Sequence, residues 1–206
     1  VCVVPILLHG APVAALKPEP DQAPADDQQP SSPAMRMWLA RLFVQVAEAT
    51  LFAYLFFWLI SLDPSVSDNQ TARLFSLIML VSAPLALLVG RWSDRSGHPI
   101  APLQACALVS ALGLVGMALA PDRNAAMLAY GLFGLSSAVF LALHSAQTLR
   151  ILPRPDRRGR DLGLFNLANT VPSLVMPWLT MALVPWAGFP ALFGLLAILS
   201  ATAGLL

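Results

Sequence analysis

The chain has 206 residues, of which 57% are hydrophobic and only 11% are charged, and its formal net charge is +1. Soluble domains carry about 25% charged residues, so this composition excludes an ordinary soluble protein and favours one whose surface faces lipid. This net charge says little about nucleic-acid or acidic partners, and we expect no nucleic-acid partner. The two cysteines, Cys2 and Cys106, have no metal-binding or redox spacing, and we expect neither a metal site nor a cofactor.

The first part of the chain divides into an apolar and a polar stretch. Residues 1–16 are apolar but short for a membrane span, and we interpret them as the end of a preceding transmembrane helix. Residues 17–36 are rich in Pro, Gln, Asp and Ser, which predicts a disordered linker. The sequence is still apolar at Leu206, so we expect it to be a fragment of a longer protein.

Six apolar blocks of spanning length follow the linker. A helix needs about 20 apolar residues to cross a bilayer, and these blocks are too long and too little alternating to be strands. The sequence therefore predicts an all-α, polytopic transmembrane helix bundle. The expected spans are residues 37–62, 72–90, 100–120, 125–149, 162–186 and 189–206.

The turns between the blocks differ in basic charge. The turn after the second block contains Arg91 and Arg95, whereas the first and third turns contain only Arg123 between them. The turn after the fourth block is rich in arginine: Arg150, Arg154, Arg157, Arg158 and Arg160. Because basic turns stay on the cytoplasmic side, we expect a multi-pass protein of the cell inner (plasma) membrane, with the linker and the basic turns in the cytoplasm.

Residues 90–99, GRWSDRSGHP, concentrate polar groups in one short turn between two apolar blocks. We expect Gly90 to allow two helices to approach closely and Gly97 to adopt a positive φ. Asp94 is suited to accept hydrogen bonds from a helix amino terminus or to pair with an arginine. An ordinary cytoplasmic turn with incidental turn residues is the alternative interpretation.

The spacing of this turn, G-x-x-x-D-R-x-G, resembles the signature loop of the major facilitator superfamily of secondary transporters. The matching residues are Gly90, Asp94, Arg95 and Gly97. Residues 160–177 look, more loosely, like the eleventh helix of many bacterial members. The layout of the chain resembles the end of helix six, the central loop and helices seven to twelve, so the likeness implies the six-helix carboxy-terminal half of that fold.

The resemblance also implies roles and a partner. It implies that Asp94 and Arg95 act in a gating loop that stabilises the outward-facing state and releases as the two halves rock. It further implies that a missing amino-terminal six-helix half is the partner of this chain, and that the substrate is a small molecule bound between the halves.

Ionisable residues at membrane depth are candidates for a transport pathway. Glu48 lies about 11 residues into the first expected span, a depth of about 16 Å at 1.5 Å per residue. Gln45 and Arg41 share its helix face. Glu48 is suited to bind a cation or to carry a proton, and a structural pairing with another helix is its alternative role. For Arg41 the alternative is a side chain that reaches back to the interface.

Further polar residues lie near the basic ends of the fourth and fifth expected spans: His144, Gln147, Asn166 and Asn169. His144 is expected either to titrate near neutral pH or to be a hydrogen-bonded packing residue. Asn166 and Asn169 are three residues apart and share a helix face, where they either line the pathway or join helices.

These patterns favour a secondary transporter of small solutes that works by alternating access and is proton-coupled. A non-transporting membrane subunit or a channel-like bundle is the alternative. An enzyme is not expected, because the sequence contains no metalloprotease or phosphate-binding motif. Ser137 and His144 cannot form a catalytic pair, because seven residues of one helix separate them by about 10.5 Å.

Overall fold

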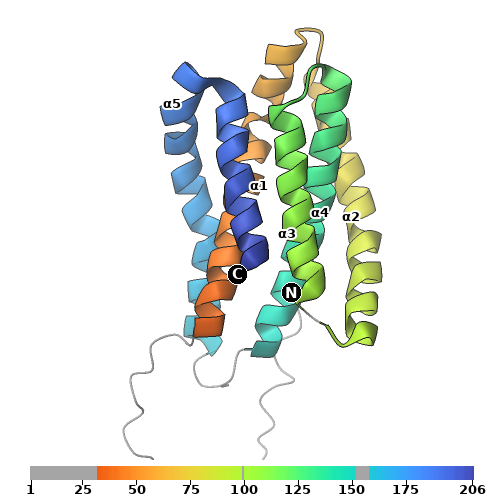
Figure 1. Cartoon of the computed structure of the whole chain (residues 1–206), viewed down its shortest axis with the longest axis vertical. Coiled ribbons are helices and arrows are strands. Elements are labelled where there is room, and N and C mark those ends of the chain that lie inside the picture. The colour runs from red at the N-terminus through yellow and green to blue at the C-terminus, as the bar shows by residue number, and fades with distance from the viewer. Residues whose placement is uncertain (1–31, 99, 152–157) are drawn as a thin grey trace, which may run out of the picture. The chain divides into compact units, whose positions relative to one another are not determined.

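The computed structural model describes residues 32–98, 100–151 and 158–206, and the described residues form five helices (Figure 1). All five are long and apolar enough to cross a membrane, and the all-helical class is as expected. The helices are α1 (Ser32–Leu62), α2 (Asp68–Ser96), α3 (Ala101–Ala118), α4 (Arg123–Ile151) and α5 (Arg158–Leu205). The expected helix end at 1–16, most of the expected linker and the turn at 152–157 lie outside the described residues.

The expected count of six helices is not confirmed, because the fifth and sixth expected spans both fall within α5. Helical geometry is interrupted there at Gly188, which has φ 73° and ψ 178°, a conformation that glycine adopts without strain. Pro190 follows at a position where a restarting helix tolerates the missing N–H group. Figure 1 shows the two parts of α5 running in opposite directions on either side of this break.

Local sequence signals explain where α2 begins and ends. Ser67 and Gln70 form a reciprocal capping box, in which the Ser67 hydroxyl accepts from the Gln70 amide at 3.4 Å and the Gln70 side chain accepts from the Ser67 amide at 3.3 Å. Gly97 ends the helix in the left-handed conformation, with φ 69° and ψ 9°. The positive φ expected for Gly97 is thus confirmed.

The helices pack around an apolar core in which α4 and α5 make most of the contacts with the other helices. α1 packs mainly against α5 and α4, α3 packs against α4 and α5, and α2 packs chiefly against α4. Leu55 of α1 is fully buried, and Trp58 on the same helix meets Phe193 of α5 edge to face with ring centroids 4.7 Å apart. A smaller cluster around Val44, Ala107 and Phe140 lies closer to the end where α1 begins.

Small residues let α4 approach its neighbours. A Cβ atom placed on Gly113 of α3 would lie 2.7 Å from the backbone nitrogen of Phe133, so this glycine sets the α3–α4 contact. A Cβ atom on Gly134 would lie 3.0 Å from the Ile78 side chain of α2. A side chain at Gly113 would push α3 and α4 apart, whereas one at Gly134 would require the Ile78 side chain to shift.

Candidate functional site

The polar residues expected on one face of α1 are all partly buried between helices. Arg41, Gln45 and Glu48 are spaced by one and two helical turns, so they form one stripe. The neighbouring positions Val44 and Ala47 are fully buried in the apolar core. The stripe therefore lies beside the packed side of α1 and faces the helices that follow it.

The guanidinium group of Arg41 joins α1 to α4 and α5. Its Nε atom donates to Oδ1 of Asn169 on α5 at 3.1 Å. Its Nη1 atom donates to the hydroxyl of Ser145 on α4 at 2.9 Å and lies 3.5 Å from Nδ1 of His144. Asn169 in turn donates from Nδ2 to Oδ1 of Asn166 at 3.2 Å. Four of the residues singled out in the sequence thus meet in one cluster at the end of the bundle where α1 begins.

The hydrogen bonds of His144 fix which of its nitrogens carries the proton. Nε2 lies 2.8 Å from the backbone carbonyl oxygen of Met37, which accepts only, so Nε2 is the donor. Nδ1 lies 3.2 Å from the hydroxyl of Thr148 and 3.5 Å from Arg41, which donates only. This pattern suits a neutral imidazole with a bare Nδ1, in a side chain that is 1% exposed.

Glu48 occupies a separate, deeper position on the stripe. It is two helical turns from Arg41, about 10.5 Å along the axis. Its carboxyl group lies beside Ser137 of α4 and within electrostatic reach of Tyr130 on the same helix. Both partners are buried. Oε2 of Glu48 is buried and has no hydrogen-bond partner among the described residues.

Gln45 and Gln147, the other two residues expected on the pathway, do not join either group. Both side chains are partly buried, Gln45 on α1 and Gln147 on α4. Within the described ranges, neither forms a hydrogen bond to the Arg41 cluster or to Glu48. They lie on α1 and α4, which are two of the three helices that carry the cluster.

The expected gating loop lies partly inside a helix. Asp94 and Arg95 belong to the last turn of α2 and are exposed, so the turn proper begins only at Gly97. The expectation that Gly90 allows a close helix approach is wrong. A Cβ atom there would meet Leu143 of α4 at 3.6 Å, an ordinary contact that alanine would tolerate.

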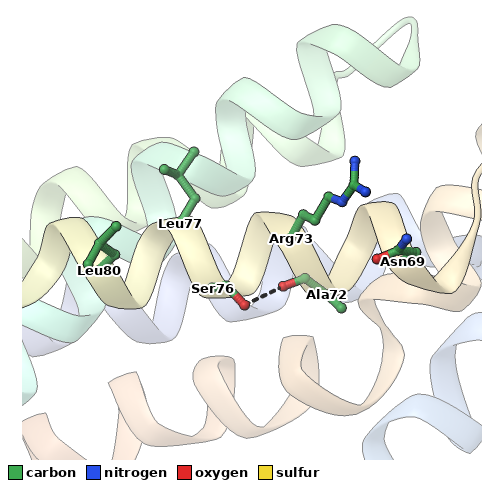
Figure 2. A pocket seen from close by; sticks show the side chains of 6 residues that line it. All are labelled: Asn69, Ala72, Arg73, Ser76, Leu77 and Leu80. Atoms are coloured by element: carbon green, nitrogen blue, oxygen red, sulfur yellow. Dashed lines mark hydrogen bonds between the residues drawn. The ribbon is translucent and has the colours of Figure 1, made fainter.

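Two hollows on the molecular surface lie away from these residues. Figure 2 shows one along α2, with Arg73 and Asn69 towards one end and Leu77 and Leu80 towards the other. All of its lining residues come from this one helix. The Ser76 hydroxyl donates a hydrogen bond to the Ala72 carbonyl at 2.9 Å. It is an exposed helix face and holds none of the residues expected at a site. A second hollow lies between α2, α3 and α4 and is almost wholly apolar.

Sequence reasoning missed two members of the Arg41 cluster, Ser145 and Thr148, and the Ser137 neighbour of Glu48. Ser145 and Thr148 follow His144 by one and four residues, and Ser137 lies two turns before it on α4. A polar stripe along α4 that matches the stripe along α1 was the signal that could have identified them. The carbonyl of Met37 carries no such signal, because every residue has one.

The sequence that forms α1 to α5 matches one family of known proteins. A family model described as Major Facilitator Superfamily matches residues 37–206, which is most of the chain and covers α2 to α5 completely and α1 from residue 37 onward. A search of curated proteins and a search of solved structures each found no match. With five helices able to span a membrane, the chain is a multi-pass membrane protein. It belongs to the Major Facilitator Superfamily, a family of secondary transporters.

Proposed function

We propose that this chain is part of a transporter that moves a small solute by alternating access and is driven by a proton gradient, with Glu48 as the proton carrier. The observation that carries the proposal is the buried, unpartnered Oε2 atom of Glu48. An unpaired carboxylate in an apolar interior costs several kcal/mol, whereas a protonated carboxyl avoids this charge penalty. Glu48 is therefore expected to hold a proton while it is buried and to release it when water reaches its carboxyl group.

The surroundings of Glu48 suit a group that alternates between two protonation states. Ser137 donates its hydroxyl hydrogen to the Gly134 carbonyl at 3.2 Å, which leaves its oxygen able to accept from a protonated carboxyl. When the carboxyl loses its proton, the same hydroxyl can turn and donate to it. The pair thus offers a hydrogen bond in either state.

We further propose that the Arg41 cluster lines the solute pathway and that the bundle works together with a second six-helix half. Ser145 and Asn166 are exposed in the described bundle, although they belong to helices that span a membrane. Polar side chains in spans face protein or water rather than lipid. A second half that covers this face would enclose them in a cavity. The basic residues Arg91 and Arg95 favour a cytoplasmic position for this end.

The test measures flux in vesicles from cells that express the intact gene. A pH gradient is imposed, and sugars, organic acids and cationic drugs are screened for accumulation. We expect Glu48→Gln to reduce gradient-driven accumulation at least about tenfold, while exchange of labelled for unlabelled solute continues, because only the proton step is lost. Asp68→Asn is the matched control, since it makes the same carboxyl-to-amide change at an exposed position at the start of α2. Normal accumulation by Glu48→Gln would show that Glu48 is a packing residue.

A further inference from the structure

The charge of Arg41 is oriented by its neighbours but is not neutralised by them. Every hydrogen bond that the structure shows for this guanidinium goes to a neutral group: the Asn169 amide, the Ser145 hydroxyl and the His144 ring. An ion pair does occur between Arg123 and Asp63, at 3.2 Å, but those residues lie where α1 ends and α4 begins. In the described part of the chain, the Arg41 cluster is therefore a positive site.

The hydrogen-bond donors of Arg41 are not used up. A guanidinium has five N–H groups and no acceptor. Nε and Nη1 have the partners given above, whereas Nη2 donates to no described residue. The fixed side chains hold the planar group in one orientation, which leaves the Nη2 edge to a ligand. The two N–H groups of Nη2 diverge, so each of them can donate one charge-assisted hydrogen bond to an oxygen of a carboxylate or a phosphate.

The two asparagines extend the same polarity. Because Arg41 only donates, Asn169 must present its oxygen to Nε and its NH2 group to Asn166. Asn166 accepts with its oxygen, so its own NH2 group stands at the end of the chain of hydrogen bonds. Asn166 is exposed. The relay therefore ends in a donor, as the guanidinium edge does, and the site presents hydrogen-bond donors to whatever binds it.

We propose that the ligand of this cluster is an anion, and that the transported solute carries a carboxylate or phosphate group that binds Arg41 and Asn166. This deepens the proposed function and rests on it for the statement that the ligand is transported. Glu48 does not compete for the charge, since its carboxyl group lies two turns away against Ser137. The anionic head group of a lipid offers the same chemistry, and the experiment separates the two sources.

The experiment is a binding measurement on the full-length gene product in detergent and in vesicles, with no gradient. The probes are inorganic phosphate, benzoate and citrate, with benzamide as the uncharged counterpart of benzoate, and the readout is the shift of the melting temperature with probe concentration. We expect at least one anion to stabilise the protein saturably, and benzamide not to do so. In Arg41→Gln the dissociation constant should rise at least tenfold, and Arg41→Lys should recover only part of the affinity because a flexible ammonium group lacks the planar shape that the Asn169 and Ser145 side chains hold in one orientation.

Three controls keep the result interpretable. Arg73→Gln removes an exposed arginine from α2 and should bind the anion as the unchanged protein does. Glu48→Gln should also retain anion binding, because its carboxyl group is not part of the cluster; normal gradient-driven accumulation by this variant would count against the proton step alone and leave the anion site standing. Unchanged anion binding by Arg41→Gln, equal binding of benzamide, or the absence of any anion-specific shift would overturn the proposal. Stabilisation by phosphatidylglycerol vesicles but not phosphatidylcholine vesicles, with no competition from the soluble anions, would assign the site to lipid and would also overturn it.

Discussion

Replacing Gly113 with alanine tests how closely α3 and α4 are packed. The added Cβ atom would lie 2.7 Å from the backbone nitrogen and 2.9 Å from the Cα of Phe133, below the 3.0 Å that real Cβ contacts keep. Backbone atoms cannot rotate away as a side chain can, so the helices must separate. Overpacking of this kind costs about 1–3 kcal/mol, against which alanine gains about 1 kcal/mol in helix propensity. The net expectation is a loss of up to about 2 kcal/mol.

A matched substitution isolates the packing cost. Gly131 lies in the middle of α4, and a Cβ atom there meets nothing within 4 Å, so Gly131→Ala should gain the helix propensity alone. The free energies of unfolding of the two variants should then differ by the packing cost, about 1–3 kcal/mol. Reversible unfolding in mixed detergent micelles, followed by circular dichroism, measures this difference. Equal effects of the two substitutions would refute the close contact between α3 and α4.

Three further predictions concern the turns and the His144 ring. Two hydrogen bonds from Ser65 hold the pKa of Asp63 below its ordinary value of 3.8. The folded state therefore gains stability above that value and loses it as the pH falls through the lower folded pKa, so unfolding measured between pH 5 and pH 2 should depend less on pH in Asp63→Asn. Gly97→Ala should cost about 1–2 kcal/mol in unfolding free energy, because φ is 69° there and no side-chain contact compensates; an unchanged stability would contradict the left-handed end of α2. The ring nitrogens of His144 should give one protonated and one bare ¹⁵N signal at neutral pH, whereas two protonated nitrogens would contradict the hydrogen-bond assignment.

The sequence was sufficient to predict which polar residues share a helix face, since that depends only on the helical period. Arg41 and Glu48 are seven residues apart and lie on one stripe in the structure, as expected. Which partner each of them meets depends on how α4 and α5 are rotated about their axes. That rotation brings Ser145 rather than Gln147 to the guanidinium, and no spacing rule within one helix contains this information.

The glycines also show that tertiary contacts could not be predicted from the sequence. Gly90 was expected to be a close helix contact because it stands in a recognisable motif, yet a Cβ atom there is tolerated. Gly113 stands in no motif, yet among the described glycines it is the one whose added Cβ atom would lie closest to another backbone. The conformation of a glycine, as at Gly97, follows from the local turn and could be predicted. The neighbours of a glycine depend on tertiary packing and could not be predicted from the sequence.

The packing of α3 has a consequence for how the protein is made. α3 is held on one side by α4, at Gly113, and on the other by the last part of α5, where Gly204 lies against Leu108. α1 likewise has α5 as its main neighbour. A ribosome delivers α5 last of the described helices, at about 5–20 residues per second. The earlier helices therefore wait in the membrane for several seconds with their α5-facing sides uncovered, so the insertion machinery or lipid has to shield them until translation reaches the end of α5.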